Sequence, residues 1–160
     1  MKKILAIVCM FVATLTFAQT QAGQSFVGVR ATNLGFSTTD GQTSVAVGAD
    51  VGHFVANNLA VVGNVGFQIA DTRNSETSGF AYGAGLKYYL GGVVPVQVDW
   101  NGTAVGGDNR VYRSNVGTSL GYAFFLTPKV SLEPTLRYNI SLNDNQKNTF
   151  SGNFGVNYFF

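Results

Sequence analysis

His53 is the only histidine among the 160 residues, so it is the first candidate for chemistry. Its sequence neighbours are Gly52 and Phe54, and period-two alternation places it among apolar side chains near one end of a strand. A single imidazole without cysteines or a group of carboxylates does not provide the three or four ligands that zinc takes. The sequence therefore predicts no catalytic, cofactor-binding or metal-binding residue, and no enzyme.

Glu133 and Arg137 are the next candidates, because they place an acid and a base on one face of a predicted strand. Residues four apart on a strand are about 13 Å from each other, so each is expected to pair with a group on a neighbouring strand. The corresponding faces of other predicted strands also carry charges: Arg30, Asp50, Lys87, Asp99 and Arg113. Because lone buried ions are costly, the sequence predicts a lumen charge network of paired, hydrogen-bonded groups.

The elements that must position these charges are eight alternating segments separated by turn residues. Their predicted ranges are 24–36, 43–54, 59–70, 79–90, 94–105, 111–125, 130–142 and 149–160. The fifth contains Asn101-Gly102, a strong hairpin signal, and is the segment that could end early. The pattern predicts an all-β fold, an eight-stranded antiparallel up-and-down transmembrane β-barrel.

Segment length and composition favour a membrane barrel over a periplasmic β-sandwich. About 9–11 residues suffice for a tilted strand to cross a bilayer. Charged residues make up only 11% of the chain, and the polar faces are rich in glycine, which a sandwich would expose. An eight-stranded barrel is only wide enough for its own side chains, so the polar lumen is expected to be packed, and a diffusion pore is not expected.

Aromatic residues gather at the strand ends that would face the periplasm. They are Phe26, Phe54, Tyr88, Tyr89, Phe124, Phe125, Phe159 and Phe160. Aromatics at this level match an interfacial girdle against lipid. Strand parity makes Phe159 the exception, an aromatic that faces inward.

The N-terminus has the pattern of a secretory signal peptide. Lys2 and Lys3 precede an apolar stretch, residues 4–17, and Thr16-Phe-Ala18 supplies small residues for cleavage. We expect cleavage after Ala18, with Ala22 as the weaker alternative, which divides the chain into a signal peptide (1–18) and a barrel domain (19–160). Cys9, the only cysteine, lies inside the signal. Removing the two lysines reduces the basic residues from 10 to 8, equal to the 8 acidic ones, so charge gives no support to nucleic-acid binding.

The last eight residues, 153–160, combine a polar residue, a glycine and two aromatics: Asn153, Gly155, Tyr158 and Phe160. On a strand, Phe154, Val156, Tyr158 and Phe160 share one face. This pattern resembles the C-terminal assembly signal of bacterial outer-membrane barrels, and the alternative is an ordinary buried strand.

With the signal peptide and the eight alternating segments, the chain resembles the small OmpX/OmpA-type outer-membrane β-barrel proteins, the outer membrane protein β-barrel domain family. The resemblance implies a monomer in the outer membrane of a Gram-negative cell envelope. It also implies contact with membrane lipid, and with periplasmic chaperones and the barrel assembly machinery during biogenesis. It implies no cofactor and no nucleic acid.

Three functions remain open at this point. The first is a structural or surface-interaction role, in which the loops near residues 37–42, 71–78, 106–110 and 143–148 could contact a host or cell surface. Solvated hairpin tips are the more ordinary interpretation of these loops. The second is a narrow channel or transporter, and the third an outer-membrane lipid-modifying enzyme, for which His53 lies at the wrong membrane level.

Overall fold

The computed structural model describes residues 20–32, 43–72, 75–105, 111–143 and 148–160. The predicted signal peptide lies outside these residues, as do the predicted loops 37–42 and 106–110 and most of the predicted loop 143–148. The strands are β1 (Ser25–Thr32), β2 (Thr43–Ala56), β3 (Leu59–Thr72), β4 (Ser75–Leu90), β5 (Val94–Val105), β6 (Val111–Gly121), β7 (Phe124–Thr127), β8 (Val130–Ser141) and β9 (Thr149–Phe159).

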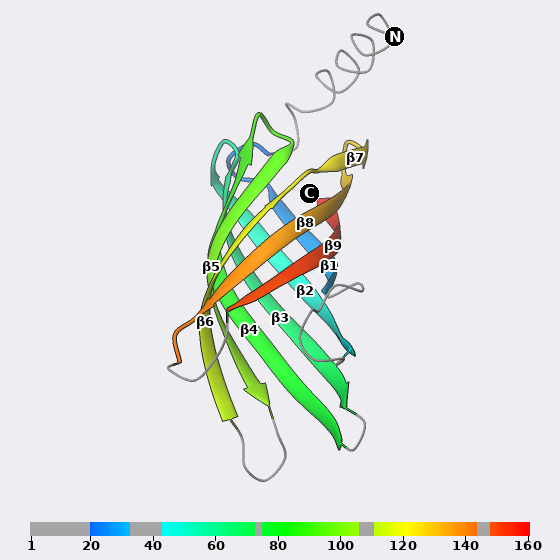
Figure 1. The fold of residues 1–160 in the computed structure, drawn as a ribbon. Helices are drawn as coiled ribbons and strands as arrows, with labels where there is room; N and C mark the ends of the chain where they lie inside the picture. Colours follow the sequence, from blue (N-terminus) through cyan, green and yellow to red (C-terminus); the bar gives the residue numbers. More distant parts are fainter. Residues whose placement is uncertain (1–19, 33–42, 73–74, 106–110, 144–147) are drawn as a thin grey trace, which may run out of the picture.

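Antiparallel pairing between neighbours runs through all of these strands, and β1 pairs with β9 while β6 pairs with β8, so the sheet closes on itself. The short β7 continues β6 along the same edge of β8. The nine strands therefore occupy eight strand positions around the barrel, and we call each position a wall. Figure 1 shows the tilted strands around one axis, with the C-terminus at the same end as the β7–β8 turn. The predicted eight-stranded up-and-down barrel is confirmed.

The register gives the stagger of the barrel. Cross-strand partners lead from Phe26 on β1, through one residue of each following wall, to Thr149 on β9. Phe26 pairs directly with Phe159, which lies ten residues after Thr149. A stagger of this size tilts the strands strongly, and eight strands enclose a space that only side chains fill.

The break between β6 and β7 lies opposite a proline. Tyr122 N donates to the Pro134 carbonyl at 3.1 Å, but Pro134 has no N–H with which to return the bond. Ladder pairing stops at Gly121 and resumes at Phe124, where Phe124 pairs with Leu132. The predicted sixth segment, 111–125, is therefore interrupted, although the same wall contains both pieces.

Two turns at the end that carries the C-terminus use left-handed backbone. Asn58, between β2 and β3, has φ of 66°, and Gly91 and Gly92, between β4 and β5, have φ of 59° and 77°.

At the opposite end of the barrel the prediction of a loop over 71–78 is wrong. Asp71 pairs with Glu76 and Thr72 with Ser75, because backbone pairing in a hairpin continues whatever the polarity of the side chains. The fifth segment does not end early: Asn101-Gly102 lies within β5, which spans Val94–Val105 as predicted.

Candidate functional site in the barrel lumen

A ring of buried residues closes the lumen at the end that carries the C-terminus. One inward residue from each wall is no more than 2% exposed: Phe26, Phe54, Ala60, Tyr89, Pro95, Ala123, Ser131 and Phe159. We call this set the closed ring. A continuous water path through the barrel would expose part of this ring, so the lumen is shut at this level.

Aromatic packing holds the closed ring together. Phe159 lies near its centre, with ring centroids 5.6 Å from Phe26, 6.3 Å from Phe54 and 6.5 Å from Tyr89. Phe125, on β7, is partly buried, and its ring centroid lies 5.5 Å from that of Phe159. Phe159 meets Phe26, Tyr89 and Phe125 at tilted or edge-on angles and is stacked on Phe54 with the ring centroids offset, and both arrangements suit the aromatic quadrupole.

These positions correct the predicted girdle. Phe26, Phe54, Tyr89 and Phe125 point into the barrel rather than toward lipid, while Phe159 faces inward as expected. In β1, β2 and β4 the period-two alternation places these aromatics on the same face as the lumen charges, and this signal was present in the sequence. Tyr88, Phe124 and Phe160 do face outward, at 43%, 52% and 61% exposed.

Glu133 is the centre of the first polar layer next to the closed ring. Lys87 Nζ donates to Glu133 Oε2 at 2.5 Å, and both Tyr89 and Ser131 donate to Oε1, at 2.9 and 3.0 Å. The Lys87 ammonium also lies 5.1 Å from the ring centroids of Phe26 and Tyr89, within cation–π range. The sequence did not point to Tyr89 and Ser131 as partners of Glu133, because cross-strand register decides which residues meet.

A second cluster surrounds Asp99. Both terminal nitrogens of Arg137 donate to the Asp99 carboxylate, a bidentate arrangement, and Gln97 and Asn101 donate to it at 2.8 and 3.1 Å. Arg137 Nε donates to Asn139 Oδ1 at 2.9 Å. Asp99 is 2% exposed, so its charge is compensated by several donors at once.

The third ion pair joins Arg30 and Asp50, with Nη2 3.0 Å from Oδ1. The structure thus brings six of the seven predicted lumen charges together as three pairs. Arg113 is exposed and makes no ion pair with a carboxylate of the described strands. Thr103 is its β5 partner, which places Arg113 toward the end of the barrel away from the closed ring.

The outer surface is apolar around the whole circumference. One outward residue from each wall is 42–60% exposed: Val29, Val51, Val65, Leu86, Val98, Leu120, Leu136 and Val156. Outward aromatics flank this band at both ends of the barrel. The ring centroids of Tyr122 and Phe124 lie 4.6 Å apart toward the C-terminal end, and those of Tyr82 and Trp100 lie 5.7 Å apart toward the opposite end. A soluble monomer rarely exposes so large an apolar surface.

His53 also lies on the outer surface, and its Nδ1 is 3.0 Å from Ser25 Oγ. A serine and a histidine in contact are two parts of a hydrolytic triad, but a third group must orient the imidazole. No carboxylate among the described residues contacts His53, and the same residues contain no group of three potential metal ligands.

On β9, Phe154, Val156 and Tyr158 are exposed, as is Phe160 directly after the strand, while Asn153, Gly155 and Asn157 face the lumen. The alternation predicted for the closing strand is therefore the one that the structure has. Among the residues with described positions, none forms a helix long and apolar enough to span a membrane.

The closed, staggered register and the inside-out polarity define the fold of the eight-stranded outer-membrane β-barrel proteins. Similar solved structures include the N-terminal β-barrel domain of Pseudomonas aeruginosa OprF, at 12% identity and a TM-score of 0.62, covering 87% of this chain and 98% of that one. OprG, an outer membrane protein of the same organism, also has 12% identity and a TM-score of 0.62, covering 90% and 99%. Ail, the attachment invasion locus protein of Yersinia pestis, has 11% identity and a TM-score of 0.57, covering 88% and 100%. No protein-family model and no curated protein matches the sequence.

Proposed function

We propose that this chain is an integral outer-membrane β-barrel protein with a packed polar lumen and a structural or surface-interaction role. The observation that carries the proposal is the combination of the apolar band outside with the closed ring inside. The band suits hydrocarbon, and the ring leaves no route for solutes. Within this proposal residues 1–18 are a cleaved signal peptide, and the mature chain is a monomer that contacts outer-membrane lipid.

The outward face of β9 supports a role in assembly. The rings of Tyr158 and Phe160 are stacked, with their centroids 6.3 Å apart. Both rings are exposed at the end of the strand that closes the barrel against β1. We propose that Asn153, Gly155, Tyr158 and Phe160 form the signal that the barrel assembly machinery recognises, after periplasmic chaperones deliver the chain.

Two measurements test the proposal. Protein from outer-membrane fractions is expected to change gel mobility on boiling, because a folded barrel resists SDS until heated. Identical mobility before and after boiling, with the protein in the soluble periplasmic fraction, would reject the membrane barrel. In planar bilayers we expect no steady conductance, and an open channel of the wild-type protein would favour a narrow channel or transporter instead.

The third function considered, a lipid-modifying enzyme, has the Ser25–His53 contact as its one structural feature. That contact lies on the outer surface at the same end of the barrel as the closed ring, and no described acid orients the imidazole. An unchanged lipid A mass spectrum in a deletion strain is expected, and an altered acylation pattern would contradict the non-enzymatic role.

A further inference from the structure

The chain turns back on itself just before β1, at the end of the barrel that carries the C-terminus (Figure 1). Gln24 N donates to the Gln21 carbonyl at 3.2 Å, which closes a four-residue turn. Gly23 is the third residue of this turn, and its φ of 92° is the positive value that a type II turn requires there. The turn directs Thr20 back against the barrel, where this residue is only 3% exposed. We call residues 20–24 the strap.

Hydrogen bonds attach both ends of the strap to β2 and to the β2–β3 turn. Gly23 N donates to the Phe54 carbonyl, and Phe54 N donates to the Gln24 carbonyl, both at 2.8 Å. At the other end of the strap, Asn58 N donates to the Thr20 carbonyl at 2.6 Å, and the Thr20 hydroxyl donates to Asn58 Oδ1. Thr20 thus holds the turn with its backbone and its side chain at once, and its loss would remove two partners of Asn58.

The strap reaches the closed ring through the same bonds. Phe54 is itself a member of the ring, and the Asn58 carbonyl accepts from the backbone N–H of Tyr89, another member, at 2.8 Å. Ala60, a third member, follows the turn on β3 and pairs with Phe54 and with Lys87. The strap therefore supports the ring on the side formed by β2, β3 and β4, next to the ammonium of a buried ion pair.

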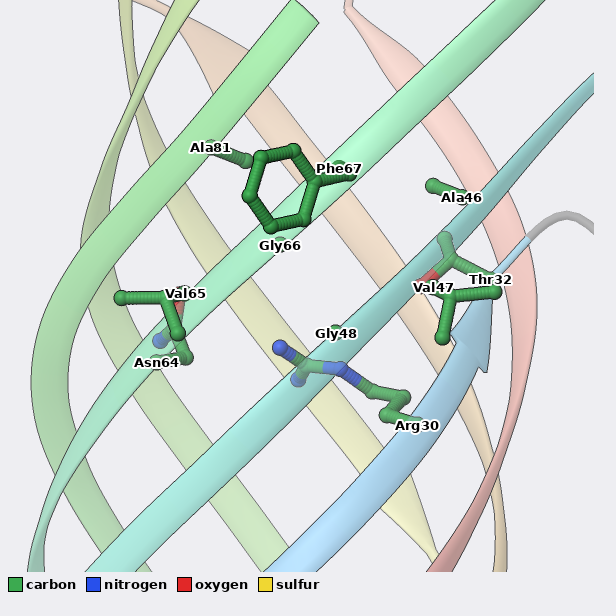
Figure 2. Close-up of a pocket in the computed structure, with 10 residues that line it drawn as sticks. All are labelled: Arg30, Thr32, Ala46, Val47, Gly48, Asn64, Val65, Gly66, Phe67 and Ala81. Atoms are coloured by element: carbon green, nitrogen blue, oxygen red, sulfur yellow. The ribbon is translucent and has the colours of Figure 1, made fainter.

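The opposite face of the closed ring, toward the loop end, is protected by the polar layer. A partly open cavity of about 70 Å³ lies further along the lumen against β1–β4, and Figure 2 shows the Arg30 side chain extending across Gly48 there, with Ala46 nearby. Between this cavity and the ring lie Lys87 and Glu133, which are 7% and 3% exposed. The ring is thus shielded from the loop end, and its other face needs a cover of its own.

We infer that the strap is a lid over the β2–β4 side of the closed ring, and that Thr20 must remain in the mature chain for the lid to form. Cleavage after Ala22 would produce a chain that begins at Gly23, without Thr20 and without the Gln21 carbonyl that closes the turn. Cleavage after Ala18 keeps both. A mature chain with the lid therefore requires the cut at Ala18. This second part rests on the proposed signal peptide, whereas the lid itself rests on the fold.

Thiol labelling of refolded protein in detergent micelles tests the lid, because the chain from Gln19 contains no cysteine. Ala60→Cys reports on the strap side of the ring, Ser131→Cys on the opposite wall, and Ala46→Cys in the cavity is the accessible reference. In a chain that begins at Gly23, we expect a small water-soluble thiosulfonate to label Ala60→Cys at least about tenfold faster than in the chain from Gln19, because only an accessible thiolate reacts. The rate for Ser131→Cys should change less than about twofold, because the opening is local.

A single hydroxyl provides the second test. Thr20→Val removes the side-chain bond to Asn58, and Thr127→Val makes the same change at an exposed position at the same end of the barrel. We expect Thr20→Val to raise the labelling rate of Ala60→Cys about threefold, as the loss of one hydrogen bond allows, and Thr127→Val to leave it unchanged. This variant decides the question if the truncated chain does not fold.

The outcomes separate the lid from the barrel itself. Unchanged labelling of Ala60→Cys in the folded truncated chain, or in Thr20→Val, would overturn the lid. An equal rise at Ser131→Cys would also overturn it, because the whole ring would then have loosened. An intact mass that begins at Gly23 would overturn the assignment of the cleavage site. Failure of the membrane barrel would instead appear as identical gel mobility before and after boiling in the chain from Gln19.

Discussion

Glu133→Gln isolates the charge of the buried ion pair between Lys87 and Glu133. Tyr89 and Ser131 both donate to Oε1, and Lys87 donates to Oε2. Glutamine can keep the oxygen that serves Tyr89 and Ser131 and replaces the other with an NH2 group, which cannot accept from Lys87. The substitution thus leaves a buried ammonium without a counter-charge while changing the shape of the side chain very little.

Breaking a buried ion pair by removing one partner costs about 3–5 kcal/mol, because the remaining charge is uncompensated. Lys87 keeps its contacts with the rings of Phe26 and Tyr89, which offset part of this loss. We therefore expect Glu133→Gln to lower the free energy of unfolding by about 3 kcal/mol, at the lower end of that range. Adding Lys87→Met removes the orphan charge and should bring stability back to within about 1 kcal/mol of wild type.

The assay is guanidinium unfolding in detergent micelles, followed by the fluorescence of Trp100. Trp100 is the only tryptophan and lies on the outer face, so unfolding moves it from detergent to water. Arg113→Gln is the matched control, a charge removal at an exposed position, and should change stability by no more than about 0.5 kcal/mol. A loss below about 1 kcal/mol for Glu133→Gln, or no coupling with Lys87→Met, would refute the assignment of Glu133 as the counter-charge of Lys87.

Three further predictions follow from the same structure. In Gly52→Ala the new methyl would lie 2.1 Å from the Phe26 ring, so the same unfolding assay should show a loss of about 1–3 kcal/mol; Gly152→Ala, with no heavy atom within 4 Å, should be near neutral. Deleting Phe160, or adding a charged tail after it, should reduce membrane assembly more than any loop substitution does, as measured by the heat-modifiable fraction in outer membranes; unchanged insertion would reject the assembly signal. Intact mass of the purified protein should correspond to a chain that begins at Gln19, and a retained leader would exclude the predicted cleavage.

Period-two alternation was enough to predict the eight segments of the barrel and most of their inward and outward faces, because each face of a barrel strand meets a different medium. The same rule, applied to Phe26 and Tyr89, would have placed both rings inside, but their position near the strand ends suggested a girdle. Residue type misled there, since an aromatic at a membrane end suits an interface and a plug equally well. The prediction of a loop over residues 71–78 was wrong for a related reason. Polar side chains indicate exposure to water, but a paired strand can extend beyond the membrane into water.

The partners of the lumen charges could not be predicted, because they depend on register. A shift of one residue in one ladder would place different side chains beside Glu133. Pro134 is a position where the sequence did contain a signal: a residue with no N–H interrupts the opposite strand, as the gap between Gly121 and Phe124 shows.

The glycines of the inner face explain how an eight-stranded barrel accommodates its charges. Asp99 has a glycine as its cross-strand partner on both sides, Gly85 on β4 and Gly117 on β6. A methyl on Gly85 would lie 2.4 Å from the Asp99 side chain, and Phe26 occupies the corresponding space above Gly52. The lumen is too narrow for eight large side chains at one level, so each large residue needs a neighbour without one. A large residue on one strand must therefore lie opposite a small residue on the next. This complementarity favours the observed register, because in a shifted register large residues would lie opposite each other.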